Sequence, residues 1–235
     1  MMFHNTLTQN KFFLGILMTV FITMLSCKHN NKIEEYTGKI RVINASYLAG
    51  AINLDVDYEK VYDFNIVYLN YTHFRSFMEG KHQIQIKDEL NNSLIDTTLT
   101  MQRDKYFSIF IYDSANTIKY LLIPEELKVS TGSNANIRFL HLSNDAPKVD
   151  VFCTPDTTAR YIEFANSDYS QYAKMDHLEH QFIAINSMTR DTLCVQPNYY
   201  FKSGAYYTLC LRGNTLSNGT DSLNFFVIED TSNYE

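Results

Sequence analysis

The sequence predicts an all-β protein that contains two tandem β-sandwich domains. Residues 52–57 alternate between apolar and polar side chains without exception, and residues 82–87 repeat this pattern of a half-buried strand. Residues 106–112 and 225–228 are rich in aromatic and β-branched side chains, which indicates more deeply buried strands. No segment after Cys27 has a sustained helical periodicity, and short strands at intervals of roughly 8 to 12 residues favour a sandwich.

The first 26 residues are predicted to be a signal peptide. Residues 12–25 form a broken apolar run that is shorter than the roughly 20 residues of a membrane-spanning helix but has the length of a signal-peptide core. The run ends in Met24-Leu25-Ser26-Cys27, which resembles a bacterial lipobox with a small residue at the cleavage site. We therefore expect a mature chain that begins at Cys27 and is held at a membrane by acyl chains such as palmitate. Residues 27–37 are expected to be a polar tether.

The two predicted domains are copies of one β-rich unit. Residues 39–46 match residues 136–143, and further matches follow in the same order along both halves, among them His82-Gln83 and His180-Gln181. Self-similarity of this kind is the signature of a repeated structural unit. We therefore predict a first domain, a linker and a second domain at residues 38–128, 129–134 and 135–230.

The second copy carries a family resemblance. Residues 137–151 read Ile-Arg-Phe-Leu-His-Leu-Ser-Asn-Asp-Ala-Pro-Lys-Val-Asp-Val and resemble the opening Arg-x-x-His-x-Ser-Pro-Asp-Ala-Pro-x-Val-Asp-Val of the family called domain of unknown function 4397 (DUF4397). Residues 204–209 are similar to its Gly-x-Tyr-Tyr-Thr strand, although Asn144 replaces a proline and the first copy is more degenerate. The resemblance implies an immunoglobulin-like β-sandwich in secreted or lipid-anchored envelope proteins, and it brings no known activity or catalytic residues.

Exposed tyrosines are the candidate ligand-binding residues, because aromatic faces stack on sugars and anchor protein interfaces. The alternative is that these side chains cover the edge of the core. The candidates are predicted to lie in loops at the ends of the second sandwich: Tyr169, Tyr172, Tyr199 and Tyr200.

Residues 176–180, Asp-His-Leu-Glu-His, are the densest group of potential metal ligands. His177 and His180 are the candidates, but the segment lacks the His-Glu-x-x-His order of zinc peptidases and reads as a polar loop between strands. We therefore expect no bound metal. Three cysteines besides Cys27 permit at most one disulfide, and we favour none: Cys153, Cys194 and Cys210.

Several functional classes are excluded. The formal net charge of −6 is spread along the chain without a basic run, whereas nucleic-acid binding needs clustered Lys and Arg. A Gly-x-Ser-x-Gly elbow and a Gly-rich phosphate loop are both absent from the sequence, so we predict no catalytic residues and no cofactor.

The expected function is that of a non-enzymatic, lipid-anchored envelope protein that binds or scaffolds a glycan or a protein partner. The alternative is an accessory enzyme of envelope or glycan breakdown, which would need a convergent pair of carboxylates. Delivery to the outer membrane is expected because Lys28, and not the Asp that retains lipoproteins in the inner membrane, follows Cys27. The cell surface and the periplasmic face both stay open.

Five triplets that begin with Asp-Ser or Asp-Thr and end in Thr, Ala or Leu resemble the O-glycosylation motif of exported proteins in Bacteroidota. The same triplets are common in turns, so both interpretations stay open. The triplets begin at Asp96, Asp113, Asp156, Asp191 and Asp221.

Overall fold

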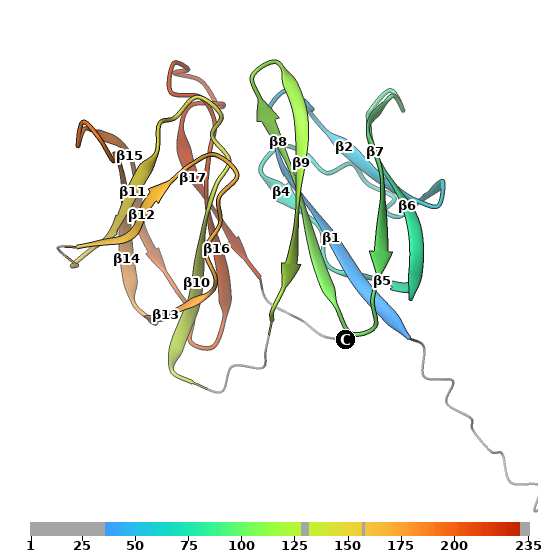
Figure 1. Ribbon diagram of the computed structural model, residues 1–235, viewed down its shortest axis with the longest axis horizontal. Helices are drawn as coiled ribbons and strands as arrows, with labels where there is room; N and C mark the ends of the chain where they lie inside the picture. The colour runs from blue at the N-terminus through green and yellow to red at the C-terminus, as the bar shows by residue number, and fades with distance from the viewer. Residues whose placement is uncertain (1–35, 128–131, 157, 231–235) are drawn as a thin grey trace, which may run out of the picture. The chain divides into compact units, whose positions relative to one another are not determined.

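The computed structural model describes residues 36–127, 132–156 and 158–230, which belong to one compact unit. Every regular element in these ranges is a β-strand (Figure 1), which confirms the predicted all-β class. No helix within the described ranges is long and apolar enough to cross a membrane. The predicted signal peptide, Cys27, nearly all of the tether and part of the linker lie outside the described residues.

The first half of the chain forms two sheets. In the first, β1 lies between β4 and β8, β9 follows β8, and β5 also pairs with β1; the second has the order β3, β2, β6, β7. The bounds are β1 (Thr37–Ala45), β2 (Ile52–Val56), β3 (Glu59–Lys60), β4 (Asn70–Tyr71), β5 (Arg75–Met78), β6 (Gly80–Asp88), β7 (Ser93–Met101), β8 (Tyr106–Ser114) and β9 (Thr117–Glu125).

The second half repeats this topology. One sheet has the order β13, β10, β16, β17 and the other has the order β12, β11, β14, β15. The parallel pairing of β1 with β8 recurs as the parallel pairing of β10 with β16. The bounds are β10 (Asn134–His141), β11 (Val149–Cys153), β12 (Ala159–Phe164), β13 (Ala173–Asp176), β14 (Glu179–Asn186), β15 (Thr192–Tyr200), β16 (Tyr206–Arg212) and β17 (Asn224–Glu229).

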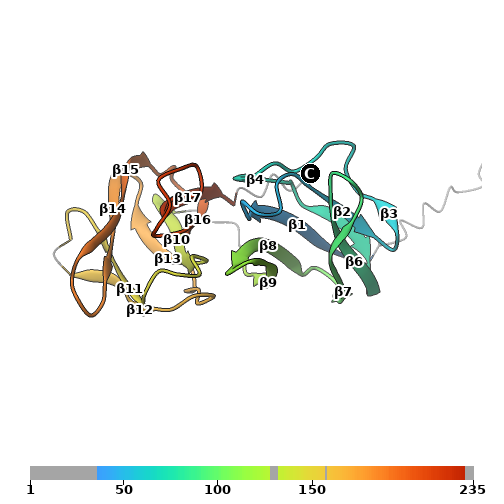
Figure 2. The ribbon, with the colours of Figure 1, turned by 90° about the horizontal axis from the view of Figure 1, so that it is seen from above.

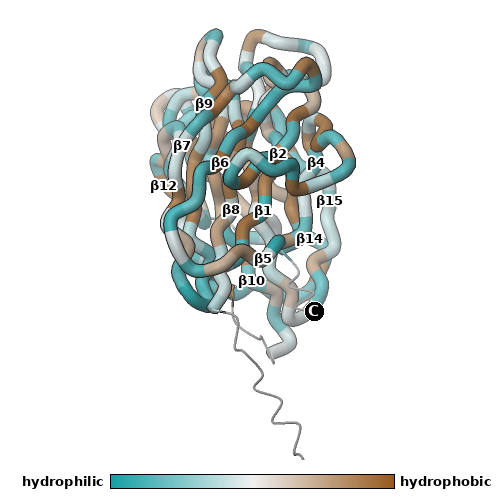
Figure 3. The backbone as a smooth tube through the Cα atoms, turned by 90° about the vertical axis from the view of Figure 1, so that its right-hand side faces the viewer, coloured by the Kyte–Doolittle hydropathy of each residue, from teal (hydrophilic) through white to brown (hydrophobic). Residues whose placement is uncertain are grey.

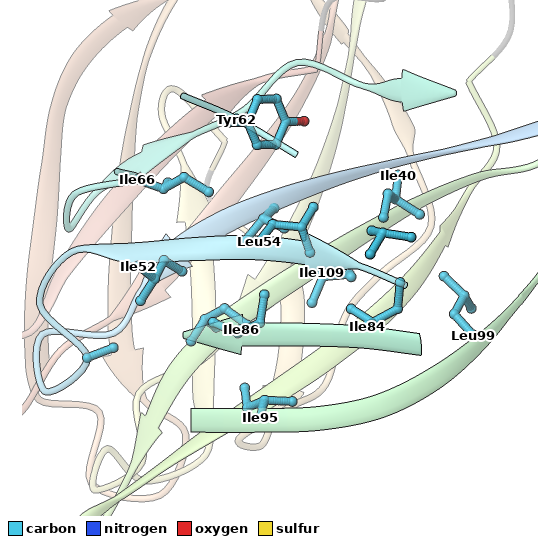
Figure 4. Packing of buried hydrophobic residues seen from close by; sticks show 14 of the residues in the cluster. Ile40, Ile52, Leu54, Tyr62, Ile66, Ile84, Ile86, Ile95, Leu99 and Ile109 are labelled. Atoms are coloured by element: carbon cyan, nitrogen blue, oxygen red, sulfur yellow. The ribbon is translucent and has the colours of Figure 1, made fainter. Parts of the chain in front are cut away.

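Each half is a sandwich with its own apolar core. In β2 the alternation of the sequence points Ile52, Leu54 and Val56 inward, where they meet Ile84 and Ile86 of β6 (Figure 4). Ile40 of β1 and Ile109 of β8 close this core from the facing sheet. Figure 3 shows hydrophobic and hydrophilic positions alternating along the strands. The second core is built in the same way from both of its sheets, and its largest side chains include Phe139, Phe182, Phe201 and Tyr207.

A third apolar cluster joins the two sandwiches. Strands β1, β8 and β9 of the first sandwich face β10, β16 and β17 of the second across a buried contact (Figure 2), which we call the inter-sandwich interface. Its apolar members are Ile43, Ala45, Phe110, Tyr112, Ile123, Leu140, Leu142, Cys210 and Ile228. Because this contact is buried and apolar, the folding of residues 38–128 and 135–230 as independent domains stays a prediction.

Candidate functional site

Two arginines lie at matching places in the inter-sandwich interface. Arg41 in β1 and Arg138 in β10 are each 2% exposed. The Nε of Arg41 donates a hydrogen bond to the hydroxyl of Ser108 at 2.7 Å, and the Nε of Arg138 donates to the hydroxyl of Thr208 at 2.7 Å. Each hydroxyl comes from the strand that pairs in parallel with the strand of its arginine. The two copies therefore share a buried hydrogen bond between an arginine and a hydroxyl group, in addition to their strand order.

The two guanidinium groups meet two buried carboxylates. Glu125 at the end of β9 accepts hydrogen bonds from Arg138 at 2.7 Å and from Arg41 at 3.3 Å, and Asp230 pairs with Arg41. Burial raises the pKa of Glu125, but the charges of Arg138 and Arg41 outweigh this effect and hold the pKa below its usual value. Two positive and two negative charges thus balance in a buried space, where one unpaired charge would be strongly destabilising.

Tyr172 belongs to this network. It lies in the segment between β12 and β13, as predicted, but it is half-buried and not exposed. Its hydroxyl donates toward Glu125 at 3.1 Å and toward Asp230 at 2.9 Å, and the guanidinium of Arg138 lies over its ring at 4.7 Å. Burial, together with the charge of Asp230, raises the pKa of Tyr172 well above its usual value. The polar atoms of this tyrosine are fully used inside the interface.

The other three candidate tyrosines lie in separate places. Tyr169 is at the surface between β12 and β13. Tyr199 and Tyr200 belong to strand β15, so their predicted placement in a loop is wrong. The ring of Tyr199 packs against Phe201 at 4.9 Å, whereas Tyr200 is 55% exposed. The structure does not bring the four tyrosines to one surface, and ligand binding by Tyr169 and Tyr200 stays a prediction.

The two candidate histidines also have different environments. His177 is half-buried in the turn between β13 and β14, while His180 is buried at the start of β14. The Nδ1 of His180 lies 3.0 Å from the carbonyl oxygen of Thr154, and its Nε2 lies 3.1 Å from that of Asp176. Within the described ranges, no group of three or more His, Cys, Asp and Glu side chains is arranged to hold a metal ion.

The cysteines after Cys27 are all free thiols. Burial raises the pKa of Cys153 to about 11 and the pKa values of Cys194 and Cys210 to about 12. At neutral pH these groups stay protonated, and a protonated thiol is a poor nucleophile. Cysteine-dependent catalysis is therefore not favoured at any of the three.

A pocket of about 150 Å³ opens at the loop end of the interface. Both sandwiches contribute to it: the β1–β2 loop and the β8–β9 turn from the first, and the β10–β11 and β16–β17 loops from the second. The polar lining is formed by carboxylates and amides without a basic side chain among the lining residues, and it comprises Asp113, Asn116, Asn144, Asp145, Asn214 and Asp221.

Two of the carboxylates also fix the loops around the pocket. Asp113 accepts hydrogen bonds from the backbone N–H of Tyr47 at 2.8 Å and from the hydroxyl of Ser46. Asp145 accepts one from the backbone N–H of Thr215 at 2.8 Å. Carboxylates that accept several backbone hydrogen bonds order a loop, so the pocket has defined walls.

The ring of Tyr47 stands at the pocket and is supported from the second sandwich. Tyr47 is 49% exposed and meets Tyr68 edge-on, with the ring centroids 5.6 Å apart. The hydroxyl of Tyr68 accepts a hydrogen bond from Nη1 of Arg212 at 3.1 Å, and Arg212 ends strand β16 of the second sandwich. The orientation of this aromatic ring therefore depends on the contact between the two halves.

The sequence did not identify this pocket. In the sequence, Asp113 and Asp221 stand out only as parts of possible glycosylation triplets, and no pattern marks Tyr47. The signal that could have found the pocket is the duplication itself, because a pocket between two repeats takes equivalent loops from each copy. The pairing of the sheets, which brings those loops together, is not encoded in any local pattern.

The comparisons with known proteins give one family and one solved structure of note. No curated protein matches the chain. Among solved structures, the chain is similar to "Crystal structure of CBMbc (family CBM26) from Eubacterium rectale Amy13K in Complex with Maltoheptaose", with 11% identity over 84% of this chain and 98% of that chain and a TM-score of 0.27.

The family model that matches is described as Domain of unknown function (DUF4397), and the match spans residues 38–152. This range contains the whole first sandwich and extends through β10 into β11 of the second. It therefore includes the first copy, which the sequence motifs marked as the more degenerate one. The predicted resemblance of this chain to the DUF4397 family is confirmed over residues 38–152.

Proposed function

We propose that this chain is a non-enzymatic binding module, held at the outer membrane by lipid on Cys27, that binds a glycan at the loop end of the inter-sandwich interface. The observation that carries the proposal is the pocket, in which a half-exposed tyrosine ring stands beside carboxylate and amide side chains. Sugars present apolar C–H faces to aromatic rings and present hydroxyl groups that hydrogen-bond to carboxylates and amides. A concave site of mixed apolar and polar lining is a general feature of small-molecule binding.

The direction of the first strand supports this proposal. Strand β1 begins at Thr37, and Ala45 at its other end lines the pocket. Nine residues of extended chain separate the two ends by about 27 Å, and the β8–β9 turn lies at the end away from Thr37 (Figure 1). The start of β1 and the pocket therefore lie at opposite ends of this strand, and this separation supports a pocket that stays open to a ligand when the chain is anchored before Thr37.

The hydrogen bonds of the carboxylates favour binding over hydrolysis. A glycosidase needs one carboxyl group free to donate a proton and a second one free to act as base or nucleophile. Asp113 and Asp145 instead accept hydrogen bonds that shape their own loops. Conversion of a bound oligosaccharide by the purified chain, lost on Asp221→Asn, would favour the alternative of an accessory enzyme.

The binding proposal is tested with a glycan array probed by the unlipidated mature chain. Tyr47→Ala is expected to abolish the signal, because it removes the aromatic ring at the pocket. Tyr200→Ala is the matched control, since Tyr200 is exposed to a similar degree at 55% but lies on β15 of the second sandwich. Equal signals from the two variants, or the absence of any bound glycan, would overturn the proposal and leave a protein scaffold as the better explanation.

The membrane attachment is tested separately in cells. Labelled palmitate is expected to enter the wild-type chain and to be absent from Cys27→Ala. Protease treatment of intact cells, with a periplasmic protein as control, then distinguishes the two faces of the outer membrane. Degradation of the chain assigns it to the cell surface, and protection until the outer membrane is broken assigns it to the periplasm.

A further inference from the structure

A thiol, a thioether and an imidazole meet inside the second sandwich. Cys153 at the end of β11, Met175 in β13 and His180 in β14 are 2%, 4% and 8% exposed. The Sγ of Cys153 lies 3.5 Å from Nδ1 of His180 and 3.9 Å from Sδ of Met175. The carbonyl oxygen of Thr154 lies 3.7 Å from the same sulfur atom and 3.0 Å from Nδ1. Three other potential metal-ligand atoms thus lie close to the sulfur of Cys153.

His180 has three hydrogen-bond partners, the thiol of Cys153 and two carbonyl oxygens. Both of its ring nitrogens face carbonyl oxygens, those of Thr154 and Asp176. A carbonyl oxygen only accepts hydrogen bonds, and a neutral imidazole carries a single N–H. If Nε2 donates to Asp176, the lone pair of Nδ1 points at the oxygen of Thr154. The thiol of Cys153 lies 3.5 Å from Nδ1 and can donate its proton to this lone pair. A cation bound between the two atoms would take the place of that proton.

The first sandwich shows how the same position is satisfied without a metal. His82 occupies the matching place, and its Nδ1 lies 2.6 Å from the carboxylate of Asp57 while its Nε2 lies 2.8 Å from the carbonyl oxygen of Met78. A carboxylate balances a second ring proton, so both nitrogens of His82 can donate. In the second sandwich, Thr154 stands directly after its strand where Asp57 stands in the first, and the carboxylate is missing.

At two positions near the histidine, the second copy has a sulfur-containing side chain where the first copy has a hydrocarbon side chain. Val56 ends β2 as Cys153 ends β11. Phe77 pairs with Gly38 in the first sandwich, as Met175 pairs with Ala135 in the second. The second copy has therefore exchanged two hydrocarbon side chains for a thiol and a thioether beside a histidine that both copies keep.

The geometry points to a binding site for a monovalent copper ion formed by Cys153, Met175 and His180. Thiolate and thioether sulfur are soft ligands that select copper(I), whereas zinc sites use Cys, His and carboxylates. With metal–sulfur and metal–nitrogen bonds of about 2.3 and 2.0 Å, ligands 120° apart lie about 3.7 Å (S to N) and about 4.0 Å (S to S) from each other. The distances of 3.5 and 3.9 Å agree with this arrangement.

Binding would involve an exchange of cations and no electron transfer. The ion displaces the thiol proton of Cys153 to solvent, the resulting thiolate and the lone pair of Nδ1 on His180 coordinate it, and Sδ of Met175 completes a three-coordinate site. The carbonyl oxygen of Thr154 then faces a cation rather than a lone pair. This site uses His180 but not His177, and it departs from our expectation that the chain binds no metal.

The test is an anaerobic copper(I) titration against the chelator bicinchoninate. It uses the full mature chain with Cys27, Cys194 and Cys210 replaced by Ala, so that Cys153 is the only thiol. One copper ion per chain is the expected result, with Cys153→Ser abolishing retention and Met175→Leu weakening it by about 10-fold or more, because a soft ligand is lost while the volume is kept. His82→Asn in the first sandwich is the matched control and should leave binding unchanged.

X-ray absorption of the copper-loaded chain gives a second, independent result. Two sulfur neighbours and one nitrogen neighbour are expected, and one sulfur neighbour in Met175→Leu. Because Met175→Leu keeps an apolar side chain of similar size, it remains informative even if Cys153→Ser fails to fold. Failure of the chain to retain copper against the chelator, or equal affinity of the parent and Met175→Leu, would overturn the site. Neither result bears on the glycan pocket, which uses other residues.

Discussion

The two sandwiches agree where they face each other and differ where they face away. At the interface, Arg41 with Ser108 and Arg138 with Thr208 repeat the same hydrogen bond at the same distance. At the outer turn, the shared histidine faces a carboxylate in the first copy and a thiol in the second. The difference teaches that the interface restricts change, because Arg41 and Arg138 each also pair with a carboxylate of the opposite copy, whereas the outer turns are free to diverge.

The largest expected effect comes from separating the two copies. The second sandwich alone, residues 132–230, is expected to form a homodimer through its exposed interface, because Arg138 of one molecule can pair with Asp230 of the other and cover the apolar cluster. Sedimentation equilibrium measures the association. A stable, folded monomer at micromolar concentration would show that the interface is dispensable and that each half is an independent domain.

Removal of a buried charge should lower the free energy of unfolding far more than removal of an exposed charge. Arg138→Met leaves Glu125 and Asp230 with a single guanidinium, and we expect a loss of about 3–5 kcal/mol in the free energy of unfolding. Lys202→Met is the control, because the Lys202–Glu229 pair lies at the surface and its loss should change stability far less. Urea denaturation compares the variants. Equal losses would contradict a role for the network in joining the sandwiches.

A smaller effect is expected at a glycine of the pocket. Gly213 has a φ of +93°, and an added Cβ would lie 2.5 Å from the carbonyl oxygen of Asp221 and would also overlap that of Ser222. Gly213→Ala should therefore destabilise the fold by about 1–3 kcal/mol. Gly50, with a φ of +61° but open space around it, is the control for the backbone conformation alone. The difference between the urea unfolding midpoints of Gly213→Ala and Gly50→Ala then measures the effect of the contact between the added Cβ and the carbonyl oxygens of Asp221 and Ser222.

The smallest effect is the titration of His82. Burial lowers the pKa of His82, but its hydrogen bond to the carboxylate of Asp57 outweighs burial and raises the pKa above 6.5. The stability that this pair adds is fully present below pH 6.5 and is lost as the pH rises through the raised pKa. Asp57→Asn should return the pKa toward 6.5 in an NMR titration. An unchanged pKa would contradict the contrast between His82 and His180.

Much of the fold was predictable, because a strand with one buried face must alternate apolar and polar residues along its sequence. The expected strands at 52–57 and 82–87 became β2 and β6 with nearly the same bounds. The wrong placement of Tyr199 and Tyr200 has a physical cause in Pro197, a residue type that is common in loops but here lies within β15. β15 is an edge strand, and a proline is tolerated there because its missing N–H can face away from the sheet. The pairing with β14 also shifts register at this point.

The candidate site was less predictable than the fold. Arg41 and Arg138 were visible as matching letters in the repeat, but nothing local indicated that two positive charges would be buried against Glu125 and Asp230. The pocket depends on the same long-range contact, since its walls come from both copies. A single sequence reveals which residues recur, but it does not reveal which recurring surfaces meet.

The interface network also sets an order on folding. Arg41 is in the first strand, and its partner Asp230 follows the last one, 189 residues further along the chain. During synthesis, the first sandwich is complete long before that carboxylate exists, so its apolar interface face, with Arg41 paired to Glu125 alone, is exposed to water until then. The interface network is complete only once Asp230 has been made, and a product that ends before Asp230 has two buried guanidinium groups with one carboxylate between them.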